Sequence, residues 1–428
     1  MRAIVSVIGF LIMAAAAAPG FARAQTVAGK FTVDELVARA LADNPDLNAA
    51  RIEVEAAAAR VEQAGLRPNP MLELGGQKAL GPDNNLTVGL SLPLDLNGRR
   101  EGRVGVAERE LETRRRQVGE RERRLRADVR MKAGELLAAQ RSLGVTEDLL
   151  RVNRDALATV GNRVREGGAP SLDESLQLVE VNRLDAGRQL ARSRVEIAAL
   201  QLKALAGMAP DTPLVVNGDL RASPVALSAS EAIERAISGR ADIAVARAEA
   251  ATGRAMVRKE QAEGRWDATV NVGYQRQDFS FALNGLTSSG AVRPIQDVFH
   301  YFGGGVSIML PVRNRNQGNI AAAEAAVRAA ERRVEFTTLT VKQEVAAAFT
   351  QYEAARRSLD LYERGVRDVA GRNLEVVRQA YQLGRGSLLD VIAEQRRYIE
   401  VENGYTEVLK QVYDAAVDIE RAVGVTSR

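Results

Sequence analysis

The sequence predicts a mostly helical chain with a duplicated helix–strand–strand–long helix–helix unit, whose strands belong to a membrane β-barrel. Three observations predict this fold: an export signal, an internal repeat, and four segments in which apolar and polar side chains alternate. The composition agrees with this fold. Aromatic residues make up only 4% of the chain, which favours long helices packed through small side chains over the core of a compact enzyme.

Residues 1–24 have the pattern of a secretory signal peptide. Arg2 supplies a positive charge, residues 4–18 are apolar, and Ala22-Arg23-Ala24 is typical of a cleavage site. No later segment approaches the roughly 18 consecutive apolar residues that a spanning helix needs. We therefore expect an exported chain without a spanning helix. That expectation leaves open a β-barrel, whose strands are weak in hydropathy.

The composition also argues against catalysis. The sequence has no cysteine and one histidine, His300, so disulfides, thiol nucleophiles and the usual zinc and copper ligand sets are missing. The methionines form no cluster for a soft metal ion. We expect no enzyme activity, no cofactor and no resident metal. His300 stands beside Tyr301 and Phe302 and is expected to be an interface or loop residue.

The charges favour solvated helix faces. The formal net charge is +4, and both signs are interleaved. The arginine-rich segment 99–130, for example, also carries Glu101, Glu108 and further glutamates. A nucleic-acid surface would instead gather charge of one sign, so no nucleic-acid partner is expected.

The chain contains an internal repeat. Four segments match in the same order: Thr32–Leu41 with Ser228–Ile237, Leu92–Leu94 with Leu310–Val312, Gly167–Asp173 with Gly384–Asp390, and Ala206-Gly207 with Val423-Gly424. Self-similarity of this kind indicates a duplicated architecture. It predicts a first repeat over 25–209, a proline-containing linker over 210–227 and a second repeat over 228–428.

Each repeat is expected to contain one very long helix. The opening helices begin with capping boxes at Thr32/Glu35 and Ser228/Glu231. The long helices cover about 97–162 and 313–383, each roughly 100 Å at 1.5 Å per residue. An apolar stripe in the second repeats every seven residues, shifts by four, and resumes, which is typical of coiled-coil packing with a stutter. Its members are Ile320, Val327, Val334, Val341, Val345, Tyr352, Leu359 and Val366.

The four alternating segments cover about 70–78, 85–94, 266–278 and 300–312. In the third, Val270, Val272 and Tyr274 alternate with polar residues or glycine, so each strand has one apolar and one polar face. A half-buried soluble sheet would give the same pattern. The export signal and the flanking aromatic residues favour a membrane barrel. The alternative is a periplasmic coiled-coil structural protein without a barrel.

Four strands cannot close a barrel, because open edges leave backbone groups unpaired in lipid. Two copies would give eight strands, too few for an open pore, whereas three would give twelve. We therefore expect a homotrimer in outer-membrane lipid. Its twelve-stranded β-barrel would stand on a twelve-helix α-barrel in the periplasm.

Several motifs resemble the TolC-like outer-membrane efflux factor family. They are Tyr381–Arg396 and its counterpart Arg165–Glu174, and the resemblance extends over the whole mature chain. Three shorter segments resemble the CzcC-like branch, the outer component of heavy-metal efflux systems. These are Leu66–Pro70, Asp95–Arg100 and Arg313–Ile320.

The resemblance implies a passive trimeric channel that docks on a periplasmic adaptor protein, which in turn joins an inner-membrane pump of the resistance-nodulation-division (RND) type. The branch implies that divalent heavy-metal cations are the cargo. The same channel could instead export drugs, other small organic molecules or a secreted polypeptide. A neighbouring pump or a resistance phenotype would separate these alternatives.

Glycines mark the expected tips of two helical hairpins. Gly167 and Gly168 lie in the first, and Gly384 and Gly386 in the second. Glycine permits tight turns without further function. The tips are nevertheless the surface expected to dock on the adaptor.

Asp173 and Asp390 lie just inside these tips, at matching positions of the repeat. A trimer would bring six such carboxylates together, and acidic rings favour cations. The resemblance places both, with Tyr381, at a channel constriction, and Arg385 lies one residue before the position of the family's basic gate residue. The simpler interpretation is helix capping, since Ser171/Glu174 forms a capping-box pattern and acidic residues suit a first helical turn.

Overall fold

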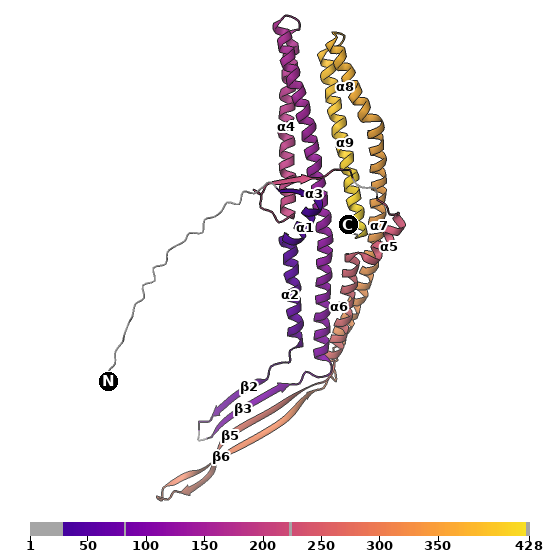
Figure 1. Ribbon diagram of the computed structural model, residues 1–428. Coiled ribbons are helices and arrows are strands. Elements are labelled where there is room, and N and C mark those ends of the chain that lie inside the picture. Colours follow the sequence, from indigo (N-terminus) through magenta and orange to yellow (C-terminus); the bar gives the residue numbers. More distant parts are fainter. Residues whose placement is uncertain (1–28, 81–82, 222–224, 425–428) are drawn as a thin grey trace, which may run out of the picture.

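The computed structural model describes residues 29–80, 83–221 and 225–424. The molecule is long, with a β-sheet at one end, helices along its length and two helical hairpins at the other end (Figure 1). The expected signal peptide lies outside the described residues, as do residues 222–224 of the expected linker and 425–428 of the second repeat. No helix among the described residues is long and apolar enough to cross a membrane.

Two copies of one unit make up most of the chain. The first consists of α1 Val33–Asp43, α2 Pro45–Gly65, β2 Met71–Lys78, β3 Asn84–Pro93, α3 Arg99–Arg165 and α4 Ser171–Leu205. The second consists of α5 Ala229–Gly239, α6 Ala241–Glu263, β5 Asp267–Leu286, β6 Val292–Met309, α7 Gln317–Leu361, the π-helical turn η1 Tyr362–Val366, α8 Arg367–Gln382 and α9 Leu388–Val423. The predicted order of elements is present in both copies.

Two details of the predicted unit are wrong. The opening helix of each copy is two helices. In the first copy Asn44 caps α2 by accepting a hydrogen bond from the N–H of Leu47, and Pro45, which has no N–H to donate, occupies the first turn. The second long helix is interrupted by η1. The capping boxes at Thr32/Glu35 and Ser228/Glu231 are present as predicted.

The strands form one antiparallel sheet in the order β2-β3-β5-β6. The register places Leu72 beside Leu90 and Leu90 beside Val272, and the next apolar row joins Val88, Tyr274 and Phe302. Residues directly opposite one another in a sheet share a face, so from the helices as far as Tyr274 the apolar positions of all four strands lie on one face. The rows between them carry mainly polar side chains and glycine.

β5 and β6 are longer than predicted. β5 ends at Leu286 rather than near 278, and β6 begins at Val292 rather than near 300. The alternation of apolar residues reverses its phase after Tyr274, which makes the strand seem to end there. The pairing nevertheless continues to Leu286 opposite Val292, with an irregular register between Ser280 and Asn284.

A second sheet of two short parallel strands was not predicted. β1 Gly29–Thr32 pairs with β4 Leu214–Asn217, which lies within the expected linker. Beneath it is a core drawn from both copies, including Leu36, Leu136, Leu202, Val216 and Leu409. This core joins α1 to the middle of α3 and of α9.

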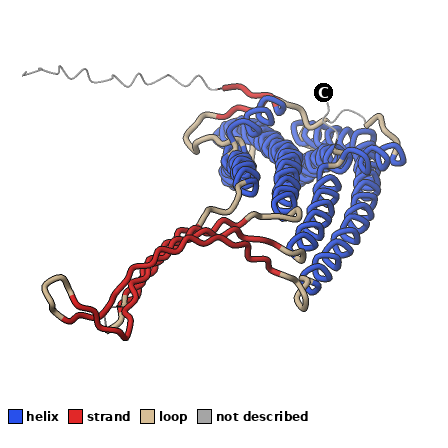
Figure 2. The backbone as a smooth tube through the Cα atoms, turned by 90° about the horizontal axis from the view of Figure 1, so that it is seen from below, coloured by secondary structure: helices blue, strands red, loops and turns tan. Residues whose placement is uncertain are grey.

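The helices pack side by side along their length. Near the sheet the order is α2, α3, α6 and α7, and towards the hairpins it is α4, α3, α9 and α8. Figure 2 shows the helices from the sheet end, with the four strands running away together from the helix ends. The predicted stripe of α7 contributes Val341, Val345 and Tyr352 to a second core. Small side chains such as Ala40, Ala133 and Ala232 are fully buried, as the composition suggested.

Candidate functional site

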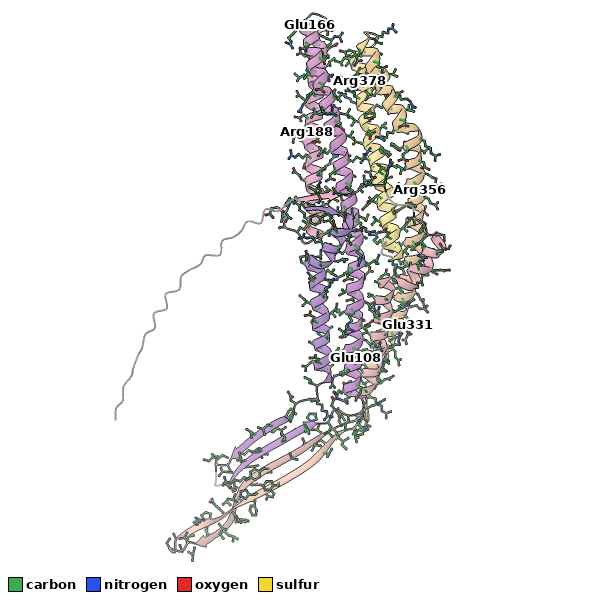
Figure 3. All side chains as sticks on the ribbon, viewed as in Figure 1. Glu108, Glu166, Arg188, Glu331, Arg356 and Arg378 are labelled. Carbon is green, nitrogen blue, oxygen red and sulfur yellow. The ribbon has the colours of Figure 1, made fainter. Side chains whose placement is uncertain are left out.

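The two hairpin tips form the candidate site. α3 ends at Arg165, and Gly167 has a left-handed φ of 73° that lets the chain turn. In the second tip Gly384 has a φ of 69° and donates its N–H to the carbonyl of Tyr381. Figure 3 labels Glu166 at the end of the first hairpin and Arg378 on α8 near the end of the second.

The predicted glycines play different parts. Gly167 and Gly384 occupy the left-handed conformation that side chains rarely adopt, whereas Gly168 and Gly386 do not have positive φ values. All four are exposed. The backbone conformation of each turn therefore requires only the first glycine of each pair. It does not require glycine at positions 168 and 386.

The structure brings Tyr381 and Asp173 together. The hydroxyl of Tyr381, on α8, donates to Oδ2 of Asp173, on α4, over 3.5 Å. Burial and the nearby Asp173 charge raise the pKa of the Tyr381 phenol, so the tyrosine stays protonated and can keep donating. This hydrogen bond links the two hairpins near their tips.

Asp390 and Arg385 are not part of that contact. Asp390 is exposed, and its carboxylate accepts hydrogen bonds from the backbone N–H and the hydroxyl of Ser387. The hydroxyl and backbone hydrogen bonds from Ser387 lower the pKa of Asp390. Arg385 is exposed, and its side chain has no hydrogen-bond or ion-pair partner among the described residues.

The capping interpretation holds in full for Asp390 and in part for Asp173, which lies in the first turn of α4 but belongs to no capping box. Ser387 and Asp390 form a capping box at the start of α9. Asp173 does not cap α4, and the predicted Ser171/Glu174 box is wrong, because the residue before α4 is Pro170, which makes no side-chain cap. The repeat aligns Pro170 with Ser387, so Ser171 of the first tip lies one residue after the N-cap position.

A buried ion pair that the sequence analysis missed joins the hairpins below the tips. Glu180, on α4, is 1% exposed and accepts hydrogen bonds from Arg183 and, over 2.9 Å, from Arg396 on α9. Burial by itself would raise the pKa of Glu180, but the hydrogen bonds from the two arginines outweigh it and the pKa is lowered. The spacing of Glu180 and Arg183 was a visible signal, yet many charged pairs in this chain share it.

Among the residues that the structure describes, no group of three or more His, Asp or Glu side chains could hold a metal ion. His300 lies on β6, where its Nδ1 is 2.7 Å from the hydroxyl of Tyr274.

Comparison with known proteins decides the family. The model of the outer membrane efflux protein family matches residues 36–208 and 232–425. The chain belongs to the outer membrane efflux protein family. The two matched segments coincide with the two copies of the unit.

Individual relatives agree with this membership. The cobalt-zinc-cadmium resistance protein CzcC of Cupriavidus metallidurans is 25% identical over 397 residues, which cover 93% of this chain and 91% of that protein. A structure of CusC superposes with a TM-score of 0.72 at 18% identity, over 91% of each chain. The outer membrane protein VceC of Vibrio cholerae gives a TM-score of 0.70 at 19% identity, over 92% of this chain and 96% of VceC.

This outer membrane efflux protein is therefore a channel component of a tripartite efflux system, not an enzyme, and its place is the outer membrane. The resemblance inferred from the sequence motifs is confirmed, and so is the predicted fold class of a mostly helical, duplicated channel protein.

Proposed function

We propose that three copies of this chain form a passive exit duct for divalent heavy-metal cations. The duct would act with a periplasmic adaptor and an inner-membrane RND pump that supply the energy and choose the cargo. One observation supports the channel most strongly: a four-stranded sheet stands at the end of helices of up to 67 residues and is open at both edges. As far as Tyr274, one of its faces is apolar and the other mainly polar.

The open edges support a trimer. β2 and β6 are the edge strands of the sheet, and their outward backbone groups would be unpaired in lipid. Pairing β2 of one copy with β6 of the next satisfies both edges and closes the ring. The exposed apolar side chains, among them Leu74, Phe302 and Ile308, would then face lipid.

The metal assignment rests on the relative and on the motifs. CzcC is named for resistance to cobalt, zinc and cadmium, and this chain shares motifs of that branch. Deleting the gene and measuring growth across Co²⁺, Zn²⁺, Cd²⁺, Ni²⁺, Cu²⁺ and a panel of hydrophobic drugs tests the cargo. We expect sensitivity confined to metals. Sensitivity confined to drugs would keep the channel and discard the metal cargo.

The tips would form the periplasmic constriction, with separate roles for the two aspartates. The contact between Tyr381 and Asp173 would hold the hairpins closed, and the exposed Asp390 would present a ring of charge to cations. In planar bilayers we expect Tyr381→Phe to raise the conductance without changing selectivity, and Asp390→Asn to lower cation selectivity. Unchanged selectivity in Asp390→Asn would leave that residue only its capping role.

The exposed tip residues Gly167, Gly168, Gly384 and Gly386 would dock on the adaptor. Because the sequence has no cysteine, Gly168→Cys provides a single reactive thiol at the tip. We expect it to cross-link to the adaptor in intact cells, whereas Gly187→Cys, in the middle of α4, should not. Equal cross-linking of the two variants would contradict tip docking.

A further inference from the structure

The two faces of the β5–β6 hairpin exchange their polarity near its outer end. Between Ala268 and Tyr274 the apolar side chains lie on the face that also carries Leu72 and Leu90. One row beyond Tyr274, that same face carries Arg276 between His300 and Leu86, so its two residues on β5 and β6 are polar. The apolar stretch therefore ends there, as expected where a lipid-facing surface leaves the membrane.

The new polar surface is well connected. Arg276 forms a salt bridge of 3.2 Å with Asp278, whose carboxylate also accepts a hydrogen bond from Asn84. Tyr274 is hydrogen-bonded to His300. Charged and polar groups arranged in this way suit water and lipid headgroups, not hydrocarbon.

The opposite face changes in the other direction. Nearer the helices it carries a polar ladder in which Ser91 donates to Asn271 and Asn271 donates to Ser307, each over 2.9 Å. Further out, the same face carries three aromatic residues from successive rows: Tyr301 opposite Gln275, Phe299 opposite Gln277, and Phe279 opposite Asp297. The Phe299 ring centroid lies 6.2 Å from that of Phe279 and 6.4 Å from that of Tyr301. We call these three residues the aromatic patch.

Nothing else in the described chain covers the aromatic patch. Its rings remain 36–48% exposed, and β3 ends its pairing with β5 at Asn84 opposite Asp278. Lipid is excluded as the cover, because the same face carries Glu73 and Asn271 further in, and Gln275 directly opposite Tyr301. In the proposed trimer this face points into the lumen, where the same face of the other two copies stands across the axis.

We propose that the aromatic patches of three copies of this chain pack against one another and form an apolar constriction at the outer mouth of the duct. This inference rests on the proposed trimeric channel. A narrow apolar ring resists ions by losing its water. The duct therefore has two barriers, a polar one at the hairpin tips and an apolar one at the far end of the sheet.

Cross-linking tests the contact between copies. The sequence contains no cysteine, so Phe299→Cys introduces one thiol per copy, and the adjacent Val298→Cys is a matched control on the other face of the same strand. In intact cells a short bismaleimide should link Phe299→Cys into covalent dimers and leave Val298→Cys monomeric. Trimers of Phe299→Cys that survive mild detergent yet show no cross-link would overturn the constriction alone. The absence of any trimer would overturn the proposed function as well.

Single-channel conductance tests whether the aromatic patches restrict the current through the duct. The double variant Phe279→Ser/Phe299→Ser, made in a Tyr381→Phe background so that the periplasmic end does not limit the current, should show a severalfold larger single-channel conductance. Val298→Ser in the same background should show no increase. Equal conductance of the double variant and this control would contradict an apolar constriction.

Discussion

The two long helical arms of the molecule differ although they occupy matching positions of the internal repeat. α3 is a single α-helix of 67 residues, whereas its counterpart is α7 and α8 with the five-residue π turn η1 between them. A π turn places an extra residue in the helix and is frequent at functional positions. The surroundings of η1 show how the second copy accommodates it.

Two pairs of matching residues make the difference concrete. Gly187 on α4 and Gly404 on α9 occupy the same place in the repeat. A Cβ at Gly187 would meet nothing within 4 Å, whereas one at Gly404 would lie 2.6 Å from the hydroxyl of Tyr362 in η1. In the second copy the missing side chain of Gly404 therefore leaves room for Tyr362 of the π turn.

The two acidic residues at matching positions also differ in burial, and again the one in the second copy is the more enclosed. Asp185 on α4 is 38% exposed and pairs with Arg154 and Arg188. Glu402 on α9 is 2% exposed and accepts from Arg141 over 3.0 Å and from Arg367 over 2.6 Å. Arg141 lies on α3 and Arg367 directly follows η1, so Glu402 ties the π turn of the second copy to the long helix of the first.

Tyr405 adds to this junction. The guanidinium groups of Arg141 and Arg367 lie 5.1 and 5.0 Å from the centre of its ring, within the range of cation–π attraction. The comparison teaches that an acid and a glycine stand at matching positions of both copies, and that only in the second copy do they contact the π turn or the arginine that follows it.

Removing the charge of Glu402 should have the largest effect. Glu402→Gln leaves two arginines without their shared counter-charge, and we expect the free energy of unfolding to fall by about 1–3 kcal/mol. The arginines are partly solvated, which keeps the loss below that of a fully buried pair. The matched change Asp185→Asn should stay within about 0.5 kcal/mol. Urea unfolding of the detergent-solubilised protein, followed by circular dichroism, measures both, and equal losses would remove the distinction between the copies.

Replacing each of the two glycines with alanine should change the free energy of unfolding in opposite directions. Gly187→Ala should stabilise its helix by about 0.5–1 kcal/mol, because alanine orders more readily than glycine. Gly404→Ala should destabilise the protein by about 1 kcal/mol, because the new Cβ meets the Tyr362 side chain.

The same unfolding assay with a Tyr362→Phe background provides the control. Removing the hydroxyl should recover part of the loss in Gly404→Ala and leave Gly187→Ala unchanged. If Tyr362→Phe gave no recovery, the contact between η1 and α9 would not be the cause.

These contrasts show which features a sequence can disclose. The strand faces and the capping boxes depend on residues close together in the chain, so their periodicity was visible. The π turn was not visible, because the apolar stripe continues through it to Val366 and its seat, Gly404, lies far along the chain. Nor could the sequence single out Glu180 and Glu402, since burial alone distinguishes them from the many glutamates on solvated faces. Strands β1 and β4 are too short to show a period.

The error at the first hairpin tip was avoidable. The repeat aligns Ser387 with Pro170, and proline has no side-chain oxygen to cap a helix. Applying that alignment would have assigned the cap to the second tip alone, as the structure has it.

The cap at the second hairpin tip should also contribute to the stability of the protein. Ser387→Ala removes the oxygen that accepts from the N–H of Asp390, and losing a serine cap costs about 0.5–2 kcal/mol. Ser171→Ala, its neighbour in the sequence pattern, should be nearly neutral, because Ser171 caps nothing.

At acidic pH, the free energies of unfolding of the wild type and of Ser387→Ala should differ less than at neutral pH. The hydrogen bonds from Ser387 lower the pKa of Asp390 in the folded protein, so their contribution to stability is present above the unfolded pKa of about 3.9. It is lost as the pH falls through the folded value. Unfolding measured at neutral pH and below about pH 4 checks this. A difference that is unaffected by pH would mean that the Asp390 carboxylate takes no part in the cap, which would leave its charge free for the cation ring proposed at the duct entrance.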